Sequence, residues 1–306
     1  MTKRFPFAHT FSIVARDPHS GEMGAAVQSH WFSTGSVVIW GEAGVGVVAT
    51  QSMVDISYGP LGLELMRAGK TPAQALQSLL ASDEGRDLRQ VAMLDVSGSV
   101  SAHSGLRCIP AAGHETGEGF SAQANMMLNA DVWPAMAQAF RASQGSLASR
   151  LIAALEAAQY AGGDIRGQQS AAILVVKGAS SGRSWADRLV DLRVEDHPCP
   201  VAELKRLVCV HSAYQLMNTG DEQLALGDVE GALEAYSAAA ALYPHNLEMP
   251  FWHAITLAEI GRVEEALPIF ASVFAAESNW RELARRLPPV DLLKVDAVTL
   301  ARILSQ

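Results

Sequence analysis

The stretch TFSIVARDPHSGEMGAAVQS, residues 10–29, decides the fold expected for the first part of the chain. Its two outer segments hold Val, Ile, Phe and Thr or an extended run of small and apolar residues, which favours strands. Between them, DPHSGE carries the Pro and Gly that are typical of a turn. The stretch therefore predicts an antiparallel hairpin whose first strand opens at Thr10.

Further strands are predicted on both sides of two helical regions. Apolar runs at 37–40, 44–50, 90–96 and 170–176 read as strands, and the last is continuous enough to be covered on both faces. The segments 60–82 and 131–163 each carry the pattern of a helix pair. Pairs of helices between groups of strands favour an α+β fold, a four-layer αββα sandwich, over alternating βαβ units.

Beyond about residue 200 the strand patterns stop and a helical repeat begins. Three positions recur after 34 residues, the period of tetratricopeptide repeats: Gly227, Ala232 and Tyr236 return as Gly261, Ala266 and Phe270. We expect three parts: a leader at 1–9, the αββα domain at 10–200, and an all-α tetratricopeptide-like domain at 201–306. The segment 201–217 is compatible with either neighbour.

The composition argues against nucleic-acid binding, membrane contact and disulfide bonds. The 306 residues are 49% apolar and carry a net charge of −9, with basic residues scattered along the chain, so a nucleic-acid partner is not expected. No apolar run reaches 18 residues and the start does not resemble a secretory signal, which predicts a cytoplasmic protein without membrane contact. The odd set of three cysteines, without CxxC spacing, predicts free thiols.

Two motifs are weighed and set aside. GVGVVA at 44–49 matches a dinucleotide fingerprint, but a turn-like sequence follows it where a helix is required. His103, Cys108 and His114 are loosely clustered without the spacing of a tetrahedral metal site. We therefore expect neither a cofactor nor a metal.

The chain resembles a bacterial domain family of unassigned function whose fold looks like that of N-terminal nucleophile (Ntn) hydrolases. The resemblance rests on the hairpin with its continuation HWFSTG, on WGEAGVGVVATQSMVDISYGPLGLELMRAGK, on GFSAQANMM and on AAQYAGGDIRGQQSAAILVV. It covers roughly residues 10–210. Some members carry an extra helical domain behind the sandwich, as this chain is expected to.

More distantly, the hairpin looks like that of proteasome-type Ntn hydrolases, in which a threonine becomes the first residue and attacks a carbonyl. A free α-amino group titrates near pH 8, so it can accept the hydroxyl proton of its own residue, whereas an amide nitrogen cannot. The resemblance thus implies Thr10 as nucleophile only after the bond from His9 to Thr10 is broken, by self-cleavage or by a peptidase. An ordinary strand threonine is the alternative.

Other positions are carried over by their place in the pattern. The resemblance implies an oxyanion-stabilising backbone N–H at Gln51, a second donor at Asn125, and an acid and hydroxyl at Asp164 and Ser170 that orient the threonine amine. VVIWGEAG lacks the lysine, and AAVQS the aspartate, of proteasome-type sites. Asp164 could equally close a turn after two glycines.

Four further polar residues are candidates for substrate contacts: His30, Tyr58, Gln123 and Arg166. Each is equally compatible with a structural or solvated role.

Three functions remain open. The first is hydrolysis of an amide C–N bond in a small molecule or peptide by Thr10. The second is a non-catalytic scaffold whose helical repeats hold a protein partner or bury the interface of a homo-oligomer, which we expect the protein to form. The third is hydrolysis without cleavage, in which Ser12, Ser29 or Asp164 acts with a bound water.

Overall fold

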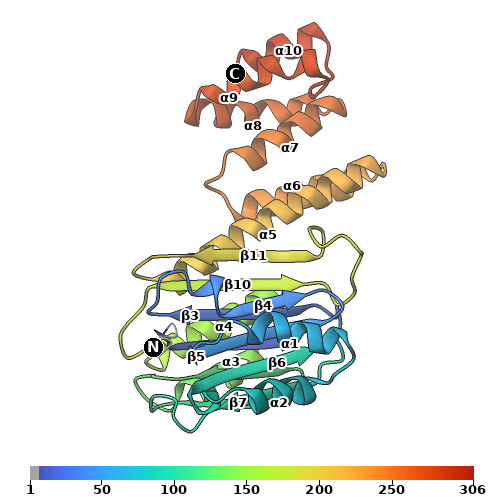
Figure 1. The fold of residues 1–306 in the computed structure, drawn as a ribbon. Helices are drawn as coiled ribbons and strands as arrows, with labels where there is room; N and C mark the ends of the chain where they lie inside the picture. Colours follow the sequence, from blue (N-terminus) through green and yellow to red (C-terminus); the bar gives the residue numbers. More distant parts are fainter. Residues whose placement is uncertain (1–6) are drawn as a thin grey trace. The chain divides into compact units, whose positions relative to one another are not determined.

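The computed structural model describes residues 7–306 and divides after Val208 into two compact units. The first unit is mixed α/β with two antiparallel sheets, and the second is helical (Figure 1). The helix α5, Pro200–Ala225, runs through the boundary. Among the described residues, no helix combines the length and apolarity needed to cross a bilayer.

The first unit contains two antiparallel sheets, which we call sheet A and sheet B. Sheet A has the order β1-β5-β6-β7, with β4 also paired to β5, and sheet B has the order β11-β10-β3-β2-β9-β8. The strands of sheet A are β1 Phe7–Ala8, β4 Ile39–Glu42, β5 Gly46–Met53, β6 Arg89–Asp95 and β7 Val100–Ser104. Those of sheet B are β2 Thr10–Arg16, β3 Met23–Ser29, β8 Gly113–Gly117, β9 Phe120–Ala124, β10 Ser170–Val176 and β11 Arg188–Val194.

The predicted hairpin is present as β2 and β3, with Thr10 directly opposite Ser29. The predicted helix pairs are also present: α1 Tyr58–Arg67 and α2 Pro72–Ser82, then α3 Val132–Ala142 and α4 Leu147–Tyr160. Ser146 caps α4 by accepting from the Ser149 amide, and Gly162 and Gly163 follow the helix with positive φ angles that favour glycine.

Helices cover the outer face of each sheet, while the inner faces contact each other. The helices α1 and α2 pack on sheet A, α3 and α4 pack on sheet B, and β2 and β3 contact β5 across the gap (Figure 1). Side chains along β2 alternate accordingly: Phe11 and Ile13 join the core under α3 and α4, while Val14 joins the core between the sheets. Because both faces are covered, β2 and β3 are buried almost throughout.

The second unit repeats a helix pair. Its helices are the later part of α5, α6 Val229–Leu242, α7 Glu248–Glu259, α8 Val263–Ala276, α9 Asn279–Arg286 and α10 Ala297–Leu304. The recurring positions found in the sequence take equivalent places: the glycines precede α6 and α8 with positive φ, and the alanines and aromatics are buried in one core. This core gathers Phe251, Phe270 and Trp280, with the rings of Phe251 and Trp280 4.9 Å apart.

The core beneath α3 and α4 offers a stability test. Replacing Phe11, which is fully buried, with Ala removes an aromatic side chain from a site that can collapse little, and should lower the free energy of unfolding by about 3–5 kcal/mol. Urea unfolding followed by circular dichroism measures it. The matched control is Phe32→Ala, because Phe32 is 62% exposed and its loss should change stability by less than about 0.5 kcal/mol. Equal effects of the two changes would contradict the assigned core.

Candidate functional site

Thr10 and Ser12 lie on the face of β2 that is turned toward sheet A. The alternation that sends Phe11 and Ile13 to the helices leaves these two hydroxyl side chains for the space between the sheets. Both are fully buried. Ser12 Oγ donates a hydrogen bond to Gln51 Oε1 on β5 at 2.6 Å, so the first strand is tied across the gap to sheet A.

A connected set of polar groups surrounds the backbone carbonyl of Thr10. This oxygen accepts a hydrogen bond from the backbone N–H of Asn125 at 3.1 Å and another from Gln51 Nε2 at 3.2 Å. Gln90 Oε1 on β6 accepts from Gln51 Nε2 at 2.7 Å and from Asn125 Nδ2 at 2.9 Å. Because buried amides are costly unless they are bonded, these contacts fix the two sheets relative to each other at the start of β2.

Gln123 extends this set on β9. Its Nε2 donates to Ser12 Oγ at 2.7 Å, and its Oε1 accepts from Ser121 Oγ at 2.8 Å. Gln123 is fully buried, so in this structure it supports the strand and does not line an open surface.

The peptide group that precedes Thr10 is also held by side chains. The carbonyl oxygen of His9 accepts from Ser29 Oγ at 2.6 Å and from Arg166 Nη2 at 2.8 Å. Ser29 reaches it because the hairpin register places Ser29 opposite Thr10. Arg166 arrives from the loop that follows α4.

The imidazole of His9 is buried beside Asn125. Its Nδ1 lies 2.8 Å from Asn125 Oδ1, and since the Asn125 amide nitrogen donates elsewhere, Nδ1 is assigned as the protonated nitrogen. Burial is the largest influence and lowers the pKa of His9; the hydrogen bond to Asn125 opposes it, while the charge of Arg166 lowers the pKa further and that of Asp164 raises it. His9 is therefore neutral at pH 7, with Nε2 as its basic nitrogen.

Asp164 holds Arg166 in place. The two form a bidentate ion pair, with Arg166 Nε donating to Oδ1 at 3.0 Å and Nη2 to Oδ2 at 2.7 Å. The side chain of Asp164 is buried, that of Arg166 is 26% exposed, and the His30 amide also donates to the carboxylate at 3.2 Å. This two-point contact fixes the plane of the guanidinium group, which also donates to the His9 carbonyl.

The structure thus brings Thr10, Gln51, Asn125, Asp164 and Arg166 into one continuous set of contacts. Gln123 joins it through Ser12.

The remaining predicted site residues lie apart from this set. Ser170 pairs with Ser29 in register, but its hydroxyl donates to the Trp31 carbonyl and accepts from the Thr34 amide at 3.0 Å, so it holds the loop after β3. The described contact of His30 with the site is through its backbone. Tyr58 belongs to the core between sheet A and its helices, where its hydroxyl donates to Asp83 at 3.1 Å.

The two motifs set aside in the sequence have ordinary structural places. The end of GVGVVA forms part of β5, which continues as a strand to Met53. His103 and His114 bond to the Arg86 carbonyl and to Ser104, respectively. Between residues 7 and 306 there is no group of three or more His, Cys, Asp or Glu side chains that could hold a metal ion.

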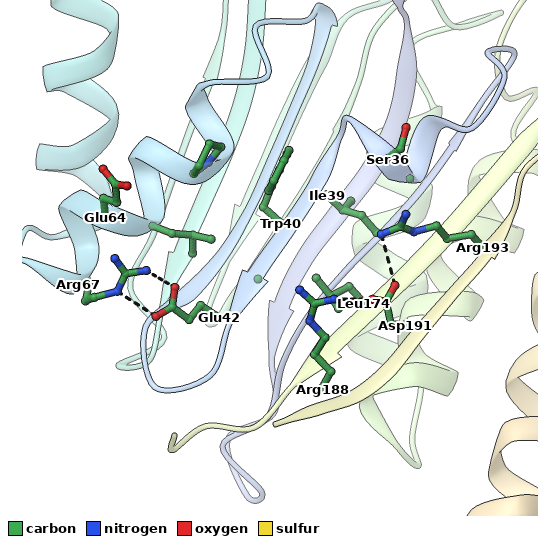
Figure 2. A pocket seen from close by; sticks show the side chains of 14 residues that line it. Ser36, Ile39, Trp40, Glu42, Glu64, Arg67, Leu174, Arg188, Asp191 and Arg193 are labelled. Carbon is green, nitrogen blue, oxygen red and sulfur yellow. Dashed lines mark hydrogen bonds and ion pairs between the residues drawn. The ribbon is translucent and has the colours of Figure 1, made fainter. Parts of the chain in front are cut away.

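An open pocket of the first unit lies elsewhere, between β4, α1, β10 and β11, and has a volume of about 310 Å³. Figure 2 shows Glu42 facing Arg67, and Asp191 lying near Arg188 and Arg193. Glu42 bonds to Arg67, and Asp191 lies 3.0 Å from Arg188 and 3.6 Å from Arg193. No predicted site residue lines this pocket, and Thr10 itself has no exposed surface.

Comparison with known proteins identifies the family. Residues 10–204 match the model of a family of unknown function (DUF1028). The chain belongs to this family. Residues 223–287 match a tetratricopeptide repeat, and no curated protein matches the chain.

A solved DUF1028 protein has a similar structure. It is the protein SPO2555 from Silicibacter pomeroyi, which is 33% identical in sequence. The matched region spans 66% of this chain and 88% of the other, with a TM-score of 0.60.

Two residues of the set, His9 and Gln90, were not predicted from the sequence. Ser29 was predicted only as a residue that could act with a bound water, although the turn at 17–22 already places it opposite Thr10. His9 was treated only as the end of a leader, although it immediately precedes the predicted nucleophile. Gln90 had no local signal, since it reaches the site only through the pairing of β6 with β5.

Imidazoles that are wholly or partly removed from water make stability depend on pH. Desolvation lowers the pKa of the buried His9 and, together with the charge of His103, the pKa of the more exposed His114, so both folded-state values lie below the unfolded value of about 6.5. The unfolded chain therefore binds more protons as the pH falls through this window, and the free energy of unfolding should decrease from pH 7.5 to pH 5.5. Urea unfolding at several pH values measures the slope.

The variant His114→Gln should reduce that slope, because it removes one of the groups that must be protonated on unfolding. The control is His19→Gln, which removes an exposed imidazole. A slope that is the same in wild type and His114→Gln would rule out the contribution of His114.

Proposed function

We propose that this DUF1028 protein is an Ntn-type hydrolase of amide bonds whose first unit is an αββα sandwich and whose nucleophile is Thr10, liberated by cleavage after His9. The packing of α1 and α2 on sheet A, of α3 and α4 on sheet B, and of the sheets on each other supports the sandwich. The place of Thr10 supports the role: it starts an inner strand, with its side chain between the sheets.

The observation that carries the proposal is the pair of donors on the His9 carbonyl. Ser29 Oγ and the cationic Arg166 both bond to this oxygen, which belongs to the peptide group that would be cleaved. Donors that are already in place where negative charge develops lower the barrier to addition at a carbonyl. Arg166 also supplies a positive charge to a site that lacks the lysine of proteasome-type enzymes.

The proposed cleavage starts with attack by Thr10 Oγ1 on the carbonyl carbon of His9, and the carbonyl oxygen takes negative charge facing Ser29 and Arg166. The C–N bond then breaks, the nitrogen of Thr10 takes up the proton lost by the hydroxyl, and an ester joins His9 to the threonine side chain. Water hydrolyses this ester and leaves a carboxylate on His9 and a free amine on Thr10.

The liberated amine would be the general base of the mature enzyme. With an ordinary pKa near 8 it accepts the hydroxyl proton of its own residue at neutral pH. The bonds from Gln51 and Asn125 to the carbonyl of Thr10 do not involve the leader, so they hold the new terminus in position. Ser29 and Arg166, released from the His9 carbonyl, would face the carbonyl of an amide substrate.

Intact mass spectrometry of purified protein tests the nucleophile. Wild type incubated at pH 7.5 should lose residues 1–9, Thr10→Ala should stay full length, and Thr10→Ser should be cut because serine keeps the hydroxyl. Only cut protein should hydrolyse members of a panel of amides. Full-length protein with the same activity, or leader loss in Thr10→Ala, would refute the proposal.

A second prediction concerns Arg166. Loss of one oxyanion donor typically slows the reaction about 10²–10³-fold, so the double variant Asp164→Asn/Arg166→Met should be cut that much more slowly. The double change leaves no unpaired carboxylate in the interior. The control is Arg141→Met, whose exposed guanidinium pairs with Glu115 away from Thr10. Equal cleavage rates in the two proteins would remove Arg166 from the mechanism.

A second function is favoured by the helical unit, which has a tetratricopeptide match and a pocket of about 440 Å³ on its own surface. Stacked helical repeats commonly present such concave surfaces to protein segments. We propose that this unit holds a protein partner, a role that would also suit a non-catalytic scaffold. Binding here does not need Thr10, so Thr10→Ala should keep it in full.

A further inference from the structure

The pocket of the helical unit is built from helices that follow one another in the chain. Its walls come from α5, α6 and α7, and the segment after Val290 closes one side. Its volume of about 440 Å³ falls in the range of pockets that enclose a ligand.

The charge of this lining is strongly one-sided. Four carboxylates, those of Asp221, Glu248, Glu259 and Asp291, stand against the single amine of Lys294. Within the described part of the chain, none of these five groups takes part in an ion pair. This differs from the pocket of the first unit, where Glu42 and Asp191 are paired with arginines.

Neutral donors hold two of the carboxylates in place without cancelling their charge. The hydroxyl of Tyr236 donates to Asp221 at 2.6 Å, and the hydroxyl of Tyr214 donates to Glu248. Burial and Asp221 raise the pKa of Tyr236, and the bond to Glu248 raises the pKa of Tyr214, so both phenols remain donors at neutral pH. The negative charges are thereby fixed at the rim of an aromatic pocket.

The rest of the lining suits the stem of a long cationic side chain. Trp252 and Tyr214 contribute aromatic rings to the lining, and aromatic rings attract cations; Met217, Leu224 and Ile255 contribute apolar surface for methylene groups. A lysine or arginine presents both features, an alkyl stem and a charged head. An acidic ligand would meet four like charges and only one opposite charge.

We propose that this pocket binds a lysine- or arginine-bearing peptide segment of a partner protein. The inference rests on the partner-binding role proposed for the helical unit and names the chemistry of the partner. Charge complementarity selects a basic segment, and the open groove across three helices suits an extended chain. The carboxylates of α5 and α7 then contact the cationic heads while Trp252 packs on a stem.

The test uses the full chain and fluorescence anisotropy of labelled peptides. The probe alternates Lys and Arg with Ser, and a Glu version of the same length serves as the opposite-charge peptide. The basic peptide should bind, and the pocket variant Glu248→Gln/Glu259→Gln should weaken it about tenfold while keeping the glutamine oxygen as an acceptor. Lys294→Gln, which removes the opposing charge, should tighten binding about threefold.

The matched control is Glu222→Gln/Glu277→Gln. It makes the same change in net charge at two exposed carboxylates of this unit that do not line the pocket, and it should leave the affinity unchanged. Equal weakening by both double variants would show general attraction to an acidic protein and overturn the proposal.

The other outcomes distinguish the proposal that the helical unit binds a partner from the proposal that the partner segment is basic. Binding of the acidic peptide in place of the basic one would leave partner binding standing and refute the basic segment. Binding of neither peptide would refute both. Spermidine that binds the pocket as tightly as the basic peptide would replace the peptide with a free polyamine as the ligand.

Discussion

The contact of Ser29 and Arg166 with the carbonyl of His9 is the constraint around which the first unit is arranged at the head of β2. Ser29 reaches that oxygen only in the observed hairpin register, since a shift by one residue would turn its hydroxyl to the other face. Arg166 reaches it only because the buried carboxylate of Asp164 fixes the guanidinium. The β2–β3 hairpin, the loop that carries Arg166 and the carboxylate of Asp164 therefore all act to hold one peptide group.

The same site shows why a buried polar interior is tolerated here. Gln51 and Asn125 each bond to Gln90 and to the carbonyl of Thr10, so the amides are satisfied by partners from both sheets. A half-satisfied set would destabilise the sandwich, and a fully bonded one fixes how the sheets meet. None of these bonds to the carbonyl of Thr10 comes from the chain before it, so the processing proposed for Thr10 would leave them in place.

In the helical unit, two carboxylates of the pocket are held by neutral hydroxyl groups and not by arginines. Within the first unit, carboxylates such as Asp164 and Asp83 are paired with arginines and stabilise the fold. In the pocket of the second unit, Asp221 and Glu248 are instead held by phenol hydroxyls. Neutral donors preserve the negative charge, so the surface keeps an electrostatic preference that an ion-paired surface would lack. The proposed catalytic site and the proposed binding surface therefore differ in how their carboxylates are held.

Local pattern was sufficient for the hairpin, the two helix pairs, the buried strand at 170–176 and the 34-residue repeat, because turn residues, caps and apolar periodicity act over a few neighbours. It missed β7, β8, β9 and β11, which are short or carry polar and charged residues and become strands only by pairing with strands already in place. Of the candidate site, Thr10 follows from its place at the head of the hairpin, whereas the meeting of Gln90, Asn125 and Arg166 around it follows from strand order. Strand order depends on contacts between residues far apart in the chain, and no short stretch of sequence encodes those.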